Sequence, residues 1–263
     1  MADVLYEAAG GVATITLNRP EQLNTMGGEL VPQAAVAMAR AAEDDSIRAV
    51  ILTGAGRAFC AGGDLRGMGG GDGEAPATVE ASVARLRSHM RTSQLLHEMP
   101  KVTIAAINGA CAGAGLAWAC ACDIRYCADS AKFNTAFMTA GLSGDFGGTW
   151  TLPRIVGPAK ARELYLLAEK FDAAEAERIG LVSAVLPDGE LLAFAWEKAA
   201  RIAGFAPLTL RAIKENLNDA LELGLSEQLD REARRHVRCG RTEDAREAAR
   251  AFLEKRQPVF KGR

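Results

Sequence analysis

The chain has 263 residues, 49% of them hydrophobic and 24% charged, with a formal net charge of -2 at pH 7. This balance predicts a globular protein with one large domain, or one domain with a small appendage. The small net charge gives no reason to expect nucleic acid or an anionic membrane as a partner, and no apolar run reaches the roughly 18 residues of a membrane span.

The cysteines and the opening segment of the chain indicate in which cellular compartment the protein is expected. The opening segment, MADVLYEAAGG, lacks the basic start and apolar core of a signal peptide. Six cysteines form no CxxC pair and lie mostly in apolar segments: Cys60, Cys111, Cys120, Cys122, Cys127 and Cys239. We therefore expect a cytoplasmic protein with buried, reduced thiols, and neither disulfides nor a metal site.

The first part of the chain alternates strands and helices. Residues 4–17 predict a β-hairpin, because β-branched residues flank a glycine pair. A helix is expected over 30–42, a buried strand over 48–53 and a longer helix over 78–98. The glycine-rich segment 67–73 is expected to form a mobile loop or lid.

The stretch 104–123 is the centre of the pattern. An apolar strand over 102–107 meets Asn108-Gly109, small residues continue to Gly115, and an apolar helix follows over 116–122. A strand, a tight turn and a helix N-terminus together present free backbone N–H groups and a positive end-charge. This arrangement predicts a site for an anion or a developing oxyanion, or else close helix–strand packing without a ligand.

The remaining segments continue the strand–helix order and then become helical. Short strands are expected over 123–127, 132–133 and 182–185, a second glycine-rich loop over 141–148, and helices over 160–168 and 172–178. Further helices are expected over 191–203, 208–223, 227–238 and 243–255. The sequence thus predicts an α/β core over residues 1–200 and a C-terminal helical region over 201–263.

Five segments resemble the crotonase (enoyl-CoA hydratase/isomerase) superfamily: LNRPEQLN at 17–24, AFCAGGDL at 58–65, AAINGACAGAGLAWACACDIRYCAD at 105–129, AKFNTAFMTAGLSGDFGGTWTLPRIVG at 131–157 and AFLEKRQPVFKGR at 251–263. The resemblance implies a ββα spiral core with a C-terminal helical subdomain, a homotrimer or a dimer of trimers, and an acyl-CoA thioester substrate. Coenzyme A then enters as part of the substrate, and no separate cofactor is implied.

The resemblance also implies an oxyanion hole and a coenzyme A path. Its two N–H donors match Gly63 and Ala114, the second at a position where glycine is usual. The coenzyme A path matches Arg19, Leu23, Arg57, Ala61, Leu65, Phe260 and Lys261. Basic side chains suit phosphate groups, although exposed arginines and lysines are more often simply solvated.

The catalytic positions depart from the hydratase pattern. Hydratases of this family use two glutamates, and the matching residues here are Ala117 and Phe137, which cannot move a proton. With Leu116, these two residues are expected to line the acyl pocket. What remains is Asp145, whose loop resembles that of ring-epoxide (1,2-epoxyphenylacetyl-CoA) isomerases. An apolar setting would raise the pKa of Asp145 towards the range of a general base.

The sequence therefore favours an acyl-CoA isomerase in which Asp145 shuttles a proton, with four alternatives open. Asp145 could instead cap the turn before residues 149–154 through its side-chain oxygen. The chain could be a hydratase with a non-standard site. It could also be an aromatic acyl-CoA dehalogenase or hydrolase, but the nearest histidine for dehalogenation, His89, is one residue out of register. Finally, it could bind acyl-CoA without turnover.

Overall fold

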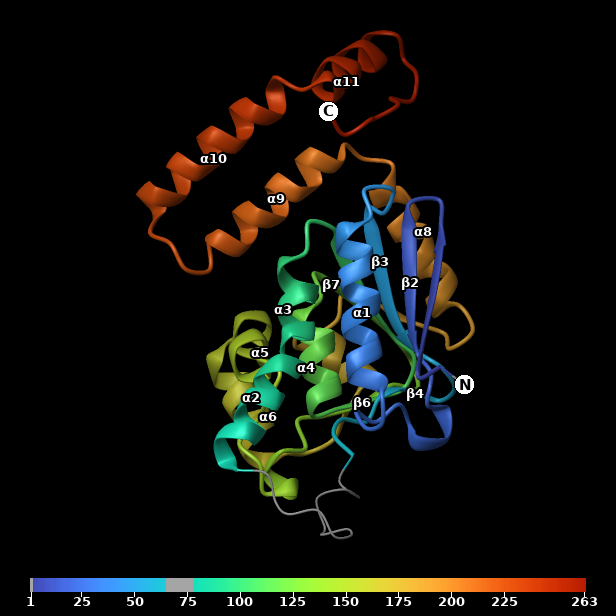
Figure 1. Ribbon diagram of the computed structural model, residues 1–263, viewed down its shortest axis with the longest axis vertical. Coiled ribbons are helices and arrows are strands. Elements are labelled where there is room, and N and C mark those ends of the chain that lie inside the picture. Colours follow the sequence, from blue (N-terminus) through green and yellow to red (C-terminus); the bar gives the residue numbers. More distant parts are fainter. Residues whose placement is uncertain (1, 65–77) are drawn as a thin grey trace.

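The computed structural model describes residues 2–64 and 78–263, so Leu65 and the glycine-rich segment 67–73 lie outside the described residues. Two sheets form the body (Figure 1). The larger sheet has the order β1 (Val4–Ala9), β2 (Val12–Leu17), β3 (Ala49–Gly54), β5 (Val102–Ile107), β7 (Ile124–Ala128), β10 (Val185–Leu186). The smaller sheet has the order β4 (Ala58–Cys60), β6 (Ala110–Ala112), β8 (Lys132–Asn134), β9 (Phe171–Asp172).

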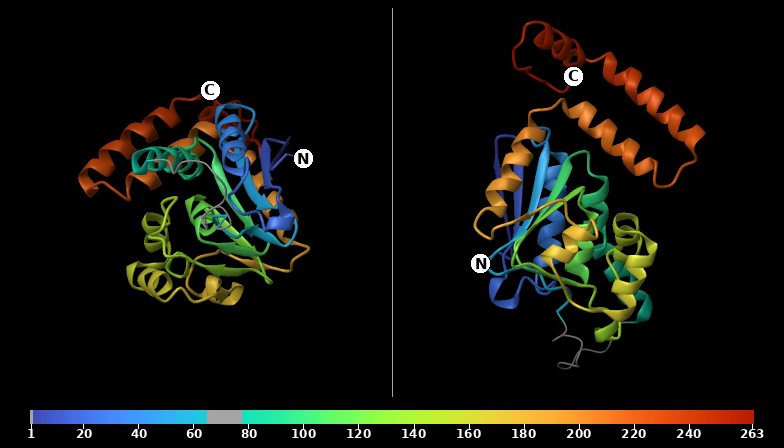
Figure 2. Two further views of the ribbon diagram at one scale, coloured as in Figure 1. Left: turned by 60° about the horizontal axis from the view of Figure 1, so that its bottom comes forward. Right: turned by 180° about the vertical axis from the view of Figure 1, so that it is seen from behind.

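Helices cover both faces of the larger sheet, which is parallel except for the β1–β2 hairpin. Along β3, Val50 and Leu52 pack on the side of α1 (Leu30–Glu43), and Ala49 and Ile51 pack on the side of α8 (Leu191–Ala203). Figures 1 and 2 show α1 in front of the sheet and α8 behind it. Because both faces are buried, the central strands are continuous apolar runs, as their sequence predicts.

The turn between the two sheets is made by glycines that touch another backbone. A Cβ on Gly109 would lie 2.2 Å from the carbonyl oxygen of Arg57, and one on Gly115 would lie 2.3 Å from that of Cys60. Gly113 has a φ of +52°, which turns the chain into α4 (Ala114–Ala121). The small-residue segment therefore serves both close packing and an N-terminal turn, and its use as an anion or oxyanion site stays a prediction.

Two further helices precede α4 in the chain, and two follow it. They are α2 (Val79–His89), α3 (Arg91–Glu98), α5 (Gly148–Val156) and α6 (Pro158–Leu167). The prediction of one helix over 78–98 is wrong, because the helix is interrupted at Met90 and two helices result. α3 buries Thr92, Ser93 and Leu96, whereas α2 buries no residue. The interruption thus separates a helix that packs on the body from one that does not.

Two smaller expectations meet different outcomes. Asp172 caps α7 (Ala173–Arg178), since its carboxylate accepts from the N–H of Glu175 at 3.0 Å, as predicted. The strand expected over 182–185 is instead β10, Val185–Leu186. No helix among the described residues has both the length and the apolar character that crossing a membrane requires.

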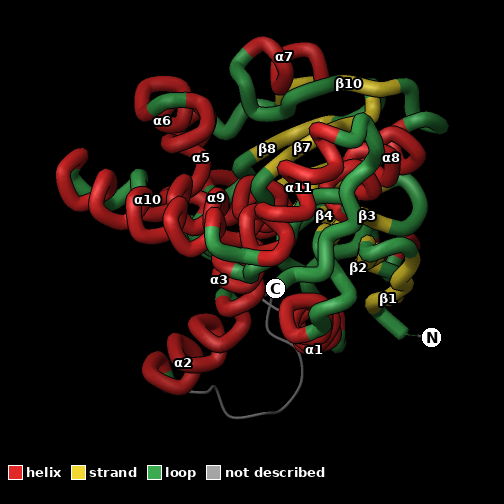
Figure 3. Tube along the Cα trace, turned by 90° about the horizontal axis from the view of Figure 1, so that it is seen from above, coloured by secondary structure: helices red, strands yellow, loops and turns green. Residues whose placement is uncertain are grey.

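The C-terminal helices leave the body as an arm. α9 (Pro207–Asp219) and α10 (Leu225–Gly240) run side by side, and α11 (Glu243–Leu253) lies beyond them (Figures 1 and 3). Lys214 ties α9 to the body: its buried ammonium donates to the carbonyls of Leu96 and Lys101 at 3.2 and 2.9 Å and to Asp123 Oδ2 at 2.8 Å. All of its three donors are thus satisfied.

The cysteines lie mainly inside the body. Cys60, Cys111, Cys120, Cys122 and Cys127 are buried and unpaired, whereas Cys239, on α10, is partly exposed. Burial raises the pKa of the Cys60, Cys122 and Cys127 thiols to about 12. The thiols are therefore protonated structural groups at neutral pH.

We expect Gly109→Ala to destabilise the fold, because its methyl group would overlap the backbone carbonyl of Arg57. The free energy of unfolding in urea should fall by about 2 kcal/mol or more. Gly189→Ala is the control, since a Cβ there meets nothing within 4 Å. Equal stability of the two variants would contradict the close approach.

Candidate active site

Two backbone N–H groups meet where β4 ends and α4 begins. Ala114 is the first residue of α4, so its N–H has no partner within the helix. Gly62 lies against it, because a Cβ on Gly62 would be 3.6 Å from the Ala114 nitrogen. Within the described part of the chain, neither the Gly63 nor the Ala114 N–H donates a hydrogen bond. The Ala114 methyl group is accommodated in the core, with 2% of the residue exposed.

Asp145 lies between the short helix η3 (Met138–Ala140) and α5. Its Oδ1 is buried and has no hydrogen-bond partner. Burial raises the pKa of Asp145 to about 6, the predicted direction. The alternative that its side chain caps the turn is wrong: the residue at the N-cap of α5 is Gly147, and no side chain caps the helix. Asp145 contributes its backbone carbonyl instead, which accepts from the N–H of Gly148 at 3.1 Å.

The two positions where hydratases carry glutamate are apolar walls of this region. A Cβ on Gly148 would lie 3.2 Å from the Ala117 Cβ, and one on Gly113 would lie 3.9 Å from Phe137 Cζ. Ala117 and Phe137 are 2% and 6% exposed, and Leu116 is 3% exposed. Ala117 thus lies against Gly148, close to Asp145 along the chain, and the contact of these residues with an acyl group stays a prediction.

Tyr165, on α6, is a polar residue that the sequence analysis missed. Its ring stacks on Phe137, with centroids 6.2 Å apart and planes inclined by 13°. Its hydroxyl oxygen would be 2.5 Å from a Cβ on Gly148, so it lies beside the Asp145 turn. Burial, followed by the nearby Cys120 and Asp145, raises the pKa of Tyr165. The phenol therefore stays protonated and can donate. No motif marks it, since it falls among the leucines of an ordinary helix.

Some of the residues predicted to bind coenzyme A lie next to one another in the structure. The N–H of Ala61 donates to the carbonyl of Leu23 at 3.0 Å, which brings their two segments together. Arg57 is exposed on the turn between β3 and β4. These residues lie at the same end of the sheet as Gly63, because all of them follow the carboxyl ends of β2 or β3.

Arg19 is held by the protein itself. Its guanidinium donates to the carbonyl of Thr25 at 3.0 Å and to the side chain of Gln22, and its Nε lies 3.7 Å from Asp3 Oδ2. Its side chain is only 13% exposed. A structural role for Arg19 is thus visible, and its contact with a phosphate stays a prediction.

Phe260 and Lys261 lie at the opposite end of the sheet. Arg48, which precedes β3, donates to the Phe260 carbonyl at 3.1 Å, and the Lys261 N–H donates to Asp244 Oδ1 at 2.7 Å. Arg57, in contrast, follows the end of β3. A strand of this length spans roughly 17–20 Å. Within one chain, the structure therefore does not bring Phe260 and Lys261 to the Gly63 site.

The three histidines lie on three different helices, outside the Asp145 turn itself. His89 ends α2, His97 packs edge-on against Trp150, and His236 lies on α10. Among the described residues, no group of three or more His, Cys, Asp or Glu side chains could hold a metal ion.

Comparison with known proteins agrees with this geometry. Residues 7–263 match the family described as enoyl-CoA hydratase/isomerase. The chain is 40% identical to the 1,2-epoxyphenylacetyl-CoA isomerase of Escherichia coli, over 100% of both chains. It is 34% identical to the short-chain-enoyl-CoA hydratase of Clostridium acetobutylicum, over 97% of this chain and 96% of that protein.

The fold has equally close counterparts among solved structures. The crystal structure of an enoyl-CoA hydratase from Bacillus anthracis matches with a TM-score of 0.92 and 34% identity, and the match covers 100% of both chains. This likeness confirms the predicted α/β fold with a crotonase-like core and C-terminal helices. The chain belongs to the enoyl-CoA hydratase/isomerase family.

Proposed function

We propose that the protein is an acyl-CoA isomerase in which one carboxylate, Asp145, moves a proton. The observation that carries this proposal is the buried Oδ1 of Asp145, which has no hydrogen-bond partner among the described residues. A buried carboxylate without a partner is costly, and such groups occur mostly where chemistry needs them. Its pKa of about 6 leaves it largely ionised at neutral pH, while its conjugate acid remains a competent donor.

The proposed reaction needs no water. The Asp145 carboxylate takes a proton from a carbon next to the thioester or conjugated with it, and the electron pair moves to the thioester oxygen as an enolate. The N–H groups of Gly63 and Ala114 hold that oxygen, each contributing about 3 kcal/mol to the transition state. Protonated Asp145 then returns the proton to another carbon, so a double bond moves and no atom is gained or lost. Tyr165 supplies a protonated hydroxyl beside this path.

Isomerisation is preferred over hydration because of Ala117 and Phe137. Hydration requires groups that hold and activate a water molecule, and the two family positions for them are buried and apolar here. The relative named 1,2-epoxyphenylacetyl-CoA isomerase supports the isomerase reading, and the relatives named hydratases keep hydration as the second candidate. A binder without turnover would have no need for Asp145 in its unpartnered, buried state.

We further propose that the protein assembles as a homotrimer or a dimer of trimers. Phe260 and Lys261 lie a full strand length from Gly63 in their own chain, so they could complete the coenzyme A path only of another copy. The arm also exposes apolar side chains, among them Leu217, Leu225 and Leu229, which are 66%, 76% and 54% exposed. Assembly would cover such a surface.

The first test is solvent-deuterium exchange. Enoyl- and phenylacetyl-type CoA thioesters would be incubated with the protein in deuterated water, and products followed by mass spectrometry. We expect the wild type to exchange deuterium or shift the double bond, and Asp145→Asn to be about 100- to 10,000-fold slower. Asp45→Asn, at an exposed aspartate, is the control. Addition of water that survives the Asp145 change would contradict the mechanism.

Asp145→Asn should also change how stability depends on pH. The folded-state pKa of about 6 lies above the ordinary value of about 4, so the folded protein binds this proton more tightly than the unfolded chain. The ionised side chain therefore destabilises the fold increasingly as pH rises from about 4 to about 6. Relative to the wild type, the variant should gain stability across this window in urea titrations. A difference that is constant with pH would show that Asp145 is not desolvated.

The assembly proposal predicts a particle of three or six times the chain mass of 27.8 kDa in sedimentation velocity. Lys261→Ala should weaken coenzyme A binding several-fold, and the loss should shrink at high salt because it removes a charge contact. Lys170→Ala, at an exposed lysine on the body, should leave the affinity unchanged. A monomer with full affinity for coenzyme A would overturn the proposal.

A further inference from the structure

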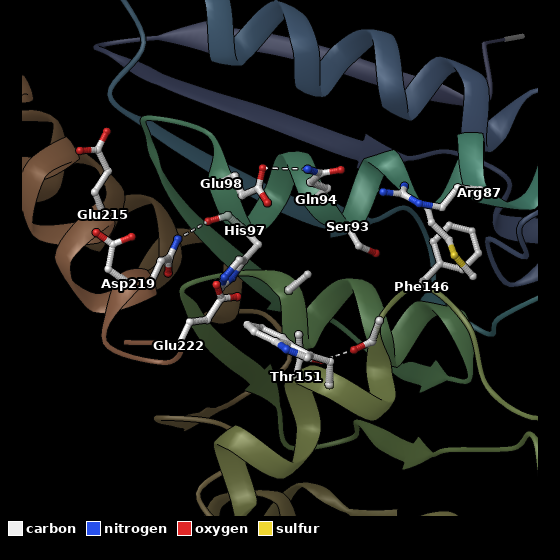
Figure 4. A pocket seen from close by; sticks show the side chains of 15 residues that line it. Arg87, Ser93, Gln94, His97, Glu98, Phe146, Thr151, Glu215, Asp219 and Glu222 are labelled. Carbon is white, nitrogen blue, oxygen red and sulfur yellow. Dashed lines mark hydrogen bonds between the residues drawn. The ribbon is translucent and has the colours of Figure 1, made fainter. Parts of the chain in front are cut away.

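A cavity of about 600 Å³ opens directly behind the Asp145 turn. It lies between α3, α5 and α9, and Phe146 and Gly147, the two residues after Asp145, form part of its wall (Figure 4). Met90 lines it at the start of α3, whereas His89 is not among the described residues that line it. The cavity therefore offers space beside the Asp145 turn into which a group held at Asp145 could extend.

One side of the cavity is apolar. Phe146 packs edge-on against Trp118, with ring centroids 5.9 Å apart. The indole of Trp150 is held on one face by the guanidinium of Arg154, 3.9 Å from the ring centroid. With Met90, these side chains offer a fixed hydrocarbon surface that suits a chain or an aromatic ring.

The α3 wall, at whose start Met90 lies, also carries side chains that have no hydrogen-bond partner among the described residues. Ser93 is 9% exposed, and its buried Oγ makes no hydrogen bond to a described residue. Four residues on, His97 lies on the same face of α3, with its ring 5.2 Å from that of Trp150. Burial, then the nearby Lys214, lowers the pKa of His97, so at neutral pH its imidazole offers one donor and one acceptor. Figure 4 shows both side chains at the cavity.

The far rim is negative. Glu98 and Glu222 line it; Glu98 accepts a hydrogen bond from Gln94 Nε2 at 3.0 Å, and neither carboxylate forms an ion pair with a described residue. Glu215 and Asp219 also line it, but arginines outside the cavity neutralise them. A carboxylate entering this end would meet two unpaired charges of its own sign.

The dimensions match a medium-sized group. Met90 and His97 are about two helical turns apart, which is roughly 10 Å along the axis of α3. A chain of about eight carbons, or a ring with a short substituent, has that reach. We propose that this cavity receives the distal part of the acyl group, and that Ser93 and His97 select acyl groups bearing a neutral oxygen there over plain hydrocarbon or carboxylate-ended ones. This proposal rests on the acyl-CoA site proposed for Asp145.

The test uses three enoyl-CoA thioesters of about eight carbons: one plain, one with a terminal hydroxyl and one with a terminal carboxylate. For the wild type we expect the hydroxyl compound to have the highest kcat/KM and the carboxylate compound the lowest. Ser93→Ala should reduce the preference for hydroxyl over plain by about three- to tenfold, while the plain compound changes less than twofold. His97→Phe, which keeps the ring contact with Trp150, should act in the same direction. Ser88→Ala, at an exposed serine of α2, should change nothing.

Calorimetric binding of the corresponding saturated thioesters separates this proposal from the isomerase proposal, because these compounds bind without undergoing turnover. Selective binding that Ser93→Ala abolishes would support the cavity assignment even if no isomerisation occurs. Binding without selectivity, or selectivity that Ser93→Ala leaves intact, would overturn the assignment even if isomerisation is efficient.

Discussion

The geometry of the site depends on how closely two backbones approach each other. Gly109 and Gly115 lie so near the carbonyls of Arg57 and Cys60 that no other residue fits without movement. This contact fixes the β4 segment against the N-terminus of α4, and with it the positions of the Gly63 and Ala114 N–H groups. In the proposed reaction, donors held in advance would need no rearrangement when charge develops on the thioester oxygen.

The properties of the Asp145 carboxylate depend on burial rather than on a close backbone contact. The turn that holds Asp145 packs against Ala117 and the Tyr165 hydroxyl at Gly148, and no described residue forms a hydrogen bond with the buried Oδ1 of Asp145. Its basicity therefore comes from the loss of water rather than from a neighbouring charge. Ala117 and Phe137 are hydrocarbon side chains at the two positions where hydratases carry glutamate, so the proposed mechanism assigns both proton steps to Asp145.

The sequence predicted those features of this region that depend on residues close together in the chain. The apolar runs of β3 and β5, the glycine turn and the cap at Asp172 each follow from neighbouring residues, and the structure has all of them. The break at Met90 was missed because α2 and α3 have similar helical character and differ only in what packs against them. Tyr165, on α6, and the pair Ser93 and His97, on α3, were not predicted near Asp145, because their position beside its turn depends on how these helices pack and no motif records such packing.

The distribution of thiols has a practical consequence for studying the protein. Five cysteines are buried, and burial raises their pKa so far that thiol reagents find almost no thiolate. Cys239 is partly exposed and lies on α10, in the arm rather than near Asp145. A maleimide dye should thus label the native chain at one position without mutagenesis. Such a dye would report on contacts made by the arm at a position away from the Asp145 turn.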